Sequence, residues 1–288
     1  MTKLTRYTPA GLISALTLCI ALLMQGSGQV FAGTFLNSCY DIPGVEAPVL
    51  ESQKALYVFI DQTMALTGSM KKAIIHLVSE WGNHGEQVKI SRFSANIKGN
   101  FTELVFDETG NIMPTEPFLF HLRSKHKKQI LSCIKKRKTE FHDALKSALT
   151  STLQLTDEKL PQTNLIHSLN DFAEQLIADQ RVQEKTVLVV SDGLEHSDLF
   201  SFHKQGVIRT INVKRALSIV RKKQLIPDWH GAKIYFLGMG HISDEKFYVR
   251  PKIIAPLKTF WQHYFNEGNG KLDANSLGTP MLLTTSIL

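Results

Sequence analysis

Cysteine is scarce in this sequence, which has three cysteines in 288 residues: Cys19, Cys39 and Cys133. None of them forms a CxxC pair, so a dithiol redox site is excluded. The sequence also has no internal repeat, no Ser/Gly-rich linker and no low-complexity tract. Because nothing of the kind that separates two domains is present, we expect one folded domain.

Local signatures of catalysis are missing too. The sequence contains no GxSxG elbow, no HExxH helix, no P-loop and no GxGxxG turn. Its 11 histidines are scattered, and the spacing of His196 and His203 matches no recognisable pair of metal ligands. We therefore predict that the protein is not an enzyme.

The overall composition is that of a globular protein. Hydrophobic residues make up 43% of the sequence and charged residues 20%, which excludes a disordered tail, a coiled coil and a membrane protein with several spans. The 33 basic and 26 acidic residues give a formal charge of +7. This excess is modest and identifies no partner by itself.

The N-terminus has the layout of a secretory signal peptide. Lys3 and Arg6 form a positive flank without acids, and the apolar stretch 12–24 follows it. That stretch is shorter than the roughly 20 residues that cross a bilayer comfortably, and small residues continue to Ala32. We predict cleavage near Ala32, and hence a periplasmic or secreted bacterial protein with no membrane span after cleavage. An uncleaved anchor helix is the alternative.

Export also suits the two cysteines that remain after cleavage. In an oxidising compartment an even pair forms a disulfide by default, which here joins Cys39 to Cys133 and closes a loop of about 94 residues. Two buried free thiols are the alternative. We divide the chain into a signal peptide, an extended N-terminal segment and a folded domain, at residues 1–32, 33–53 and 54–288.

Continuous apolar runs predict strands that are buried on both faces, as in a parallel sheet. These runs are 55–60, 186–190 and 233–237, and a last edge strand is expected at 281–286. Apolar residues at helical spacing predict helices over 69–81, 118–136, 140–153, 164–178, 213–225 and 253–265. The alternation predicts a single α/β domain in which helices flank a doubly wound, mostly parallel sheet.

Two of the predicted strands are followed by an acid, Asp61 after the first and Asp192 after the second. Ligands of such sheets bind at the carboxyl ends of the strands, so we expect both carboxylates at one edge of the sheet. With the hydroxyls of Thr63 and Thr139 they make an all-oxygen site that suits Mg²⁺ or Mn²⁺. The alternative is structural, with the acids capping turns and Thr139 capping a helix that begins there.

Three segments, YVFIDQT, KTEFHDAL and TVLVVSDG, resemble in order and spacing the site segments of von Willebrand factor A (vWA) domains. The resemblance covers roughly residues 54–265 and implies a Rossmann-like α/β fold with a metal-ion-dependent adhesion site. Matched to that motif, Asp61 is its first Asp, Thr63 its first hydroxyl, Thr139 its distant Thr and Asp192 its last Asp.

The motif is incomplete at one position. The second Ser of the family's Asp-x-Ser-x-Ser turn falls on Ala65, which has no ligand atom. Thr67, Ser69 or a water is left to take its place, or the metal is weak or absent.

The resemblance implies an exported protein that binds a protein partner, with a carboxylate of the partner completing the shell of the cation. One alternative is a scaffold component of a bacterial secretion or conjugation machine whose metal site has degenerated. Another is a phosphatase, because an apolar strand followed by Asp61 and Thr63 resembles the haloacid dehalogenase type. That chemistry needs a second Asp as proton donor at the position of Thr63.

Basic residues are concentrated in one part of the sequence. Eight Lys and Arg residues lie within the 16 residues 123–138, and 221–223 add a second cluster. Such density can engage phosphate groups of nucleic acid or of anionic lipid. No aromatic residue interleaves with the first cluster to stack on bases, so a nucleic-acid partner is not expected. The alternative is a solvated helix face.

Overall fold

The computed structural model describes residues 39–48, 52–83, 85–93, 102–110, 112–155, 163–178, 181–204, 207–241 and 251–278. They belong to one compact unit, Phe35–Leu288. The predicted signal peptide and the predicted edge strand at 281–286 lie outside the described residues. Among the helices of the described part, none is both long and apolar enough to cross a bilayer.

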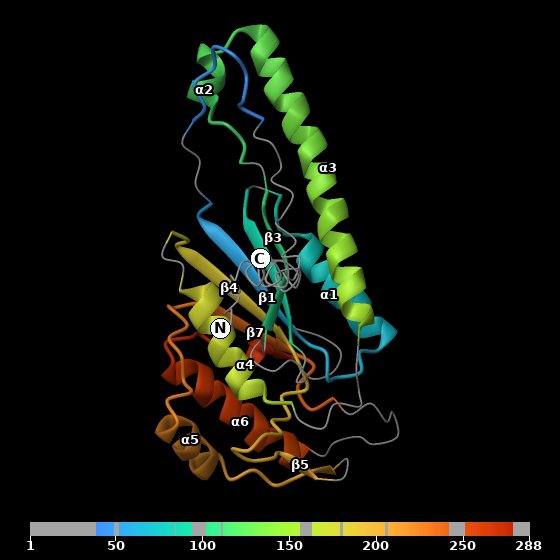
Figure 1. Cartoon of the computed structure of the whole chain (residues 1–288), viewed down its shortest axis with the longest axis vertical. Coiled ribbons are helices and arrows are strands. Elements are labelled where there is room, and N and C mark those ends of the chain that lie inside the picture. The colour runs from blue at the N-terminus through green and yellow to red at the C-terminus, as the bar shows by residue number, and fades with distance from the viewer. Residues whose placement is uncertain are drawn as a thin grey trace, which may run out of the picture. The chain divides into compact units, whose positions relative to one another are not determined.

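A six-stranded sheet forms the centre of the domain, with the strand order β3-β2-β1-β4-β7-β8 (Figure 1). The strands are β1 (Lys54–Asp61), β2 (Gln87–Phe93), β3 (Thr102–Thr109), β4 (Glu184–Val190), β7 (Lys233–Leu237) and β8 (Leu277–Gly278). Every neighbouring pair is parallel except β2 and β3. The prediction of a doubly wound, mostly parallel sheet is confirmed.

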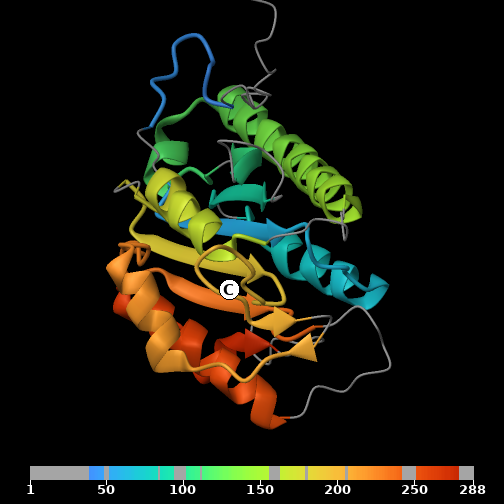
Figure 2. The same cartoon turned by 60° about the horizontal axis from the view of Figure 1, so that its bottom comes forward.

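Helices cover both faces of this sheet (Figures 1 and 2). One face packs against α1 (Gly68–Ser79) and α3 (Ser124–Gln154), and the other against α4 (Leu165–Phe172), α5 (Val213–Lys222) and α6 (Pro251–Glu267). The remaining elements are short: α2 (Glu116–His121), the π turn η1 (Ala173–Ile177) that continues α4, the 3₁₀ turn η2 (Ala274–Ser276), and a ribbon of β5 (His203–Lys204) and β6 (Val207–Ile208).

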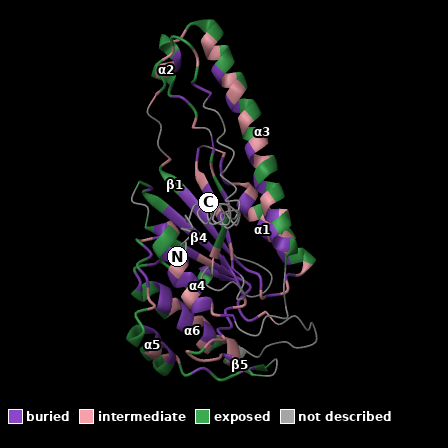
Figure 3. Cartoon of the chain, viewed as in Figure 1, coloured by how far each residue is buried: buried purple, intermediate pink, exposed green. Residues whose placement is uncertain are grey.

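Strand β1 shows why the sheet is buried on both sides. Successive side chains of a strand point to opposite faces, so Leu56, Val58 and Ile60 pack with α1 and α3. Tyr57 and Phe59 pack with α4 and α6 on the other face. All of these side chains are buried, as Figure 3 shows for the central strands, which explains the continuous apolar run in the sequence.

The basic region is one long helix rather than the two predicted from the sequence. Helix α3 continues through Lys138, Thr139 and Glu140 without a break, so the expectation that a helix begins at Thr139 is wrong. The Thr139 hydroxyl donates to the carbonyl of Lys135 (3.4 Å), as a side chain inside a helix does. No Gly or Pro interrupts this stretch, so nothing in the chain stops the helix.

Helix α1 begins one residue before the predicted range 69–81. Thr67, not Ser69, is the N-cap, and its hydroxyl accepts from the backbone N–H of Met70 (3.3 Å). Ser69 lies inside the helix, with its hydroxyl 2.9 Å from that of Thr67. The sequence offered two hydroxyl residues that suit a cap, and the extended backbone of Thr67 decides between them.

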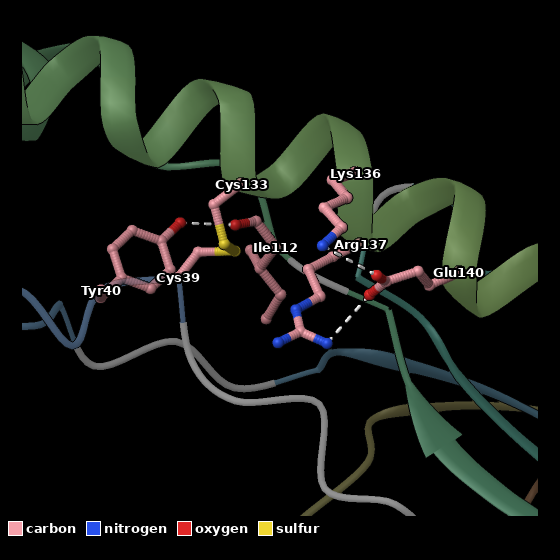
Figure 4. The surroundings of a disulfide bond; sticks show 7 residues. All are labelled: Cys39, Tyr40, Ile112, Cys133, Lys136, Arg137 and Glu140. Carbon is pink, nitrogen blue, oxygen red and sulfur yellow. Dashed lines mark hydrogen bonds and ion pairs between the residues drawn. A yellow bond between two sulfur atoms is a disulfide. The ribbon is translucent and has the colours of Figure 1, made fainter.

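The predicted disulfide is present. Cys39 and Cys133 are joined, with the two Cα atoms 5.6 Å apart, and the bond ties the segment 39–48 to α3 (Figure 4). Around it is a small apolar cluster separate from those on the sheet, in which Tyr40, Ile130 and Ile134 are buried. The Tyr40 hydroxyl donates to the carbonyl of Ile112 (2.7 Å), and burial raises the pKa of this phenol to about 12.

Candidate functional site

Asp61 is the last residue of β1, and its carboxylate is completely buried. Its Oδ1 accepts from the backbone N–H of Thr63 (2.8 Å) and from the Thr63 hydroxyl (2.6 Å). Its Oδ2 accepts from the hydroxyl of Ser191 (2.7 Å), which comes from the end of β4. Burial raises the pKa of Asp61, although these hydrogen bonds act in the opposite direction.

Asp192 lies beside this carboxylate because β1 and β4 are parallel neighbours, with Ile60 opposite Val190. The backbone holds it from two sides: its Oδ1 accepts from the N–H of Leu194 (2.8 Å), and its carbonyl accepts from the N–H of Gly240 (2.7 Å). Burial and the Asp61 carboxylate raise the pKa of Asp192 to about 8. Two acids that disfavour each other's charge therefore share the carboxyl edge of the sheet, as the sequence predicted.

The turn after Asp192 requires glycine. Gly193 has a φ of +71°, and a Cβ at this position would lie 2.7 Å from Nε1 of Trp261. That indole N–H donates to the carbonyl of Gly193 (2.9 Å). Helix α6 therefore fixes the loop after Asp192 through Trp261.

Thr139 is not part of this edge. The end of α3 reaches the edge, where the side-chain amide of Gln62 donates to the carbonyl of Thr152 (3.4 Å). Thr139 lies 13 residues earlier on the same continuous helix, which is about 20 Å along the helix axis. The structure brings together Asp61, Thr63 and Asp192, and leaves Thr139 exposed on α3.

A second threonine, Thr163, lies near the loop that follows Asp192. It is buried, and it precedes α4, whose first residue is Leu165. The backbone N–H groups of Thr163 and Asn164 both donate to the carbonyl of His196 (2.9 and 3.3 Å), in the loop that follows Asp192. The motif of the family has a Thr directly before a helix. In the sequence, Thr139 and Thr163 both precede a predicted helix, so the pattern alone does not distinguish them.

Glu195, in the loop after Asp192, joins the same two segments. It is completely buried, and its Oε2 accepts from the backbone N–H of Ile166 in the first turn of α4 (2.8 Å). A carboxylate is favoured at a helix N-terminus, yet burial raises the pKa of Glu195 to about 7 and the Asp61 carboxylate adds to this rise. Glu195 therefore ties the start of α4 to the loop that follows Asp192.

The remaining hydroxyls near the edge have other partners. Ala65 contributes no ligand atom, and Thr67 is engaged as the cap of α1. Ser191 donates to Asp61 and also accepts from the backbone N–H of Gly193 (3.1 Å).

One pair that the sequence did not indicate is formed by histidines. The rings of His196 and His203 are 4.8 Å apart. Burial and the neighbouring His196 lower the pKa of His203. Within the described ranges, no group of three or more His, Cys, Asp or Glu side chains is arranged to hold a metal ion, so the histidine pair has no third ligand of this kind.

No family model and no curated protein matches the sequence. Solved structures that are similar include proximal thread matrix protein 1 from the mussel byssus, whose metal-ion-dependent adhesion site (MIDAS) holds zinc (11% identity, TM-score 0.36, covering 81% of this chain and 42% of that one). BatB from Bacteroides thetaiotaomicron is another (13%, 0.36, 80% and 91%). A third is the pilus adhesin SpaC from Lactobacillus rhamnosus GG (12%, 0.38, 80% and 28%).

The mostly parallel sheet, the helices on both faces, and the acids after β1 and β4 are consistent with the resemblance of the sequence to von Willebrand factor A domains. Thr139 lies inside α3 and does not precede a helix, whereas Thr163 does, and Ala65 stands at the position matched to the second Ser of the motif.

Proposed function

We propose that this vWA-like domain binds a protein partner through a divalent cation at the carboxyl edge of its sheet. The observation that carries the proposal is the pair of acids, Asp61 and Asp192, brought together from the ends of neighbouring strands. Two carboxylates that repel each other in partly desolvated surroundings are costly for an isolated domain. A cation between them converts this repulsion into attraction.

The groups present fit a hard cation. Carboxylates of Asp61 and Asp192 and the hydroxyls of Thr63, Ser191 and Thr163 are oxygen donors, which Mg²⁺ and Mn²⁺ prefer. A cation held here supplies a positive charge and an open coordination position, which a carboxylate of the partner fills. Ser191 and Thr63 orient Asp61 through the hydrogen bonds described above, and the backbone of Leu194 orients Asp192.

We further infer that the protein is exported and acts without catalysis. The Cys39–Cys133 disulfide suits an oxidising compartment such as the periplasm or the cell exterior. The proton donor that a haloacid dehalogenase-like phosphatase requires is replaced by Thr63, whose hydroxyl donates to Asp61. This arrangement favours binding over phosphoryl transfer.

Thermal melting of the purified chain tests the cation site. Mg²⁺ or Mn²⁺ is expected to raise Tm relative to EDTA, because a ligand that binds only the folded state stabilises it. Asp61→Asn and Asp192→Asn should abolish this rise. Asp198→Asn, an exposed acid on the loop after Asp192, is the matched control and should keep it.

The two threonines make this test sharper. Thr163→Ala should reduce the metal-induced rise in Tm, whereas Thr139→Ala should leave it unchanged. If Thr139→Ala removes the rise and Thr163→Ala does not, our assignment of the edge is wrong. If no divalent cation changes Tm of the parent protein, the metal is not part of the function.

A second function is supported by Ala65 and Thr67. One position lacks a ligand atom and the other is used as a cap, so a scaffold protein that binds its partner without metal is the competing hypothesis. Capture of partners from bacterial envelope extract separates the two. Partner binding that survives EDTA and Asp61→Asn supports the scaffold, and binding lost under both conditions supports the cation.

A further inference from the structure

The N-terminal half of α3 presents a row of positive charge to solvent. Lys125, Lys128, Lys135 and Lys136 are all exposed, and we call them the lysine face. They lie on the side of the helix away from its buried residues, because those recur on a different set of helical positions, Ile130, Ile134, Phe141, Leu145, Leu149 and Leu153.

This charge is largely uncompensated. Of the lysine face, only Lys136 forms an ion pair with a described residue, to Glu140 at 3.5 Å, and Glu140 also binds Arg137 (2.9 Å). Exposed pairs of this kind contribute little. The other acids of the surrounding described segments, 39–48 and 112–123, are Asp41, Glu46 and Glu116.

The lysine face is held rigidly away from the sheet. The disulfide and the small apolar cluster around Tyr40 fasten the N-terminal half of α3 to the segment 39–48 (Figure 4). This cluster is separate from the two that pack on the sheet, so the N-terminal half of α3 has its own attachment.

Exposed apolar side chains also occur on and before α2, which packs against the side of α3 that carries Ile130 and Ile134 and not against the lysine face. Phe120 on α2 is 84% exposed and Met113 before α2 is 50% exposed. Phe118, two residues before Phe120, packs inward against Tyr40 with ring centroids 5.9 Å apart, so α2 turns one aromatic ring inward and one outward. Arg123 separates α2 from α3 and is itself exposed.

We propose that the lysine face docks on an anionic phospholipid surface. Exposed, largely unpaired lysines in a row on one helix are attracted by the negative surface potential of an anionic bilayer. A nucleic acid is disfavoured because no aromatic residue stands between the lysines to stack on bases. The lysines also lie on the convex surface of one helix. That shape suits a flat bilayer better than a nucleic-acid strand, which binds in a groove.

The arrangement along α3 gives this docking a consequence. Ser124 and Thr152 are 28 residues apart on one continuous helix, which is about 40 Å. The carboxyl edge of the sheet lies beside Thr152, at the opposite end from the lysine face. When the lysine face is docked on a membrane, the candidate binding edge therefore lies tens of ångströms from the N-terminal end of α3. The docking itself does not depend on the metal.

Vesicle sedimentation of the full chain in EDTA tests the proposal. Vesicles of phosphatidylcholine alone give the background, including any binding through the apolar stretch 12–24. Added phosphatidylglycerol should increase binding strongly, and an increase of salt from about 0.1 M to about 0.5 M should reverse this. Since each lysine near the surface contributes about fivefold, Lys125→Gln/Lys128→Gln/Lys135→Gln should lower binding about 100-fold.

A matched variant removes the same charge elsewhere. Lys214→Gln/Lys222→Gln/Lys223→Gln changes three exposed lysines on and just after α5, and binding should fall by less than about threefold. Phe120→Ser changes an exposed residue on the other side of α3 and should leave binding nearly unchanged, and circular dichroism confirms that each variant is folded. Equal losses in the two triple variants, or no response to phosphatidylglycerol, would overturn the proposal. So would lysine-face-dependent binding to a DNA duplex without binding to the vesicles.

Discussion

The two ends of α3 lie in contrasting surroundings. Its C-terminal half packs Phe141, Leu145 and Leu149 into the large apolar cluster beneath the sheet, and it ends beside the carboxyl edge. Its N-terminal half rests on a small cluster and one disulfide. The first end lies near buried and partly buried carboxyl groups whose pKa values are raised, and the second displays positive charge in exposed positions. A large packed cluster can offset the free-energy cost of burying ionisable groups close together. A small cluster cannot offset this cost, so the charged groups next to it stay exposed to water.

Removal of the disulfide should lower stability more than any of the other substitutions. Beyond this loss of global stability, it should alter local structure only at the N-terminal half of α3. Cys39→Ser/Cys133→Ser opens a loop of 94 residues, which is expected to lower the free energy of unfolding by about 4 kcal/mol. Hydrogen exchange should become faster around Ile130 and Ile134, because their cluster is small. Denaturant unfolding measures the first effect and exchange mass spectrometry the second.

The carboxyl edge supplies the control for this experiment. Exchange in β1 and β4 should be unchanged in the disulfide variant once global unfolding is subtracted. The rise in Tm with Mg²⁺ or Mn²⁺ should also persist. Faster exchange in these strands would show that the two ends are not independent.

A change of pH should act on the opposite end. The pKa of Glu195 is raised to about 7, against 4.5 for an ordinary Glu, so between these values the folded protein keeps a proton that the unfolded chain releases. Stability of the metal-free protein must therefore fall as pH rises through this interval. Glu195→Gln removes the charged state and should be more stable than the parent at pH 8 by up to about 3 kcal/mol.

The same comparison at low pH checks the sign. Near pH 4 the parent carries a protonated Glu195 in both states, so the two proteins should unfold at the same denaturant concentration. Measurements in EDTA at both pH values decide the point. A variant that is less stable at pH 8 would show that the charged carboxylate is needed at the start of α4.

The sheet could be predicted because strands buried on both faces appear as uninterrupted apolar runs. Asp61 and Asp192 followed from the same reasoning, since the residue after a parallel strand must lie at the carboxyl edge. Thr163 could not be chosen over Thr139 by such an argument. Both precede residues that suit a helix, and only the continuity of α3 through Thr139 shows which of them begins an element. Glu195 was missed because its burial depends on contacts between distant segments.

Gly193 offers a smaller test of how the edge is held. Gly193→Ala places a Cβ against Trp261 and forces a non-glycine residue to a φ of +71°, which should cost roughly 2 kcal/mol of stability. The turn that carries Asp192 should shift as well, so the metal-induced rise in Tm should shrink. Gly44 also has a positive φ, of +78°, but nothing lies within 4 Å of its added Cβ. Gly44→Ala should therefore destabilise less and leave the metal response unchanged.

Thr67→Ala should have the smallest effect, and it separates capping from metal binding. Thr67 lies two positions after Ala65 and is the nearest hydroxyl that could replace the missing ligand, yet it accepts from the N–H of Met70 as the cap of α1. Loss of a cap costs about 1 kcal/mol, so Tm should fall by a few degrees with and without metal alike. Thr67→Ser keeps the hydroxyl and should restore the parent value. If Thr67→Ala instead abolishes the difference between Mg²⁺ and EDTA, the hydroxyl is a ligand, and the motif is complete at a position that the sequence alone does not indicate.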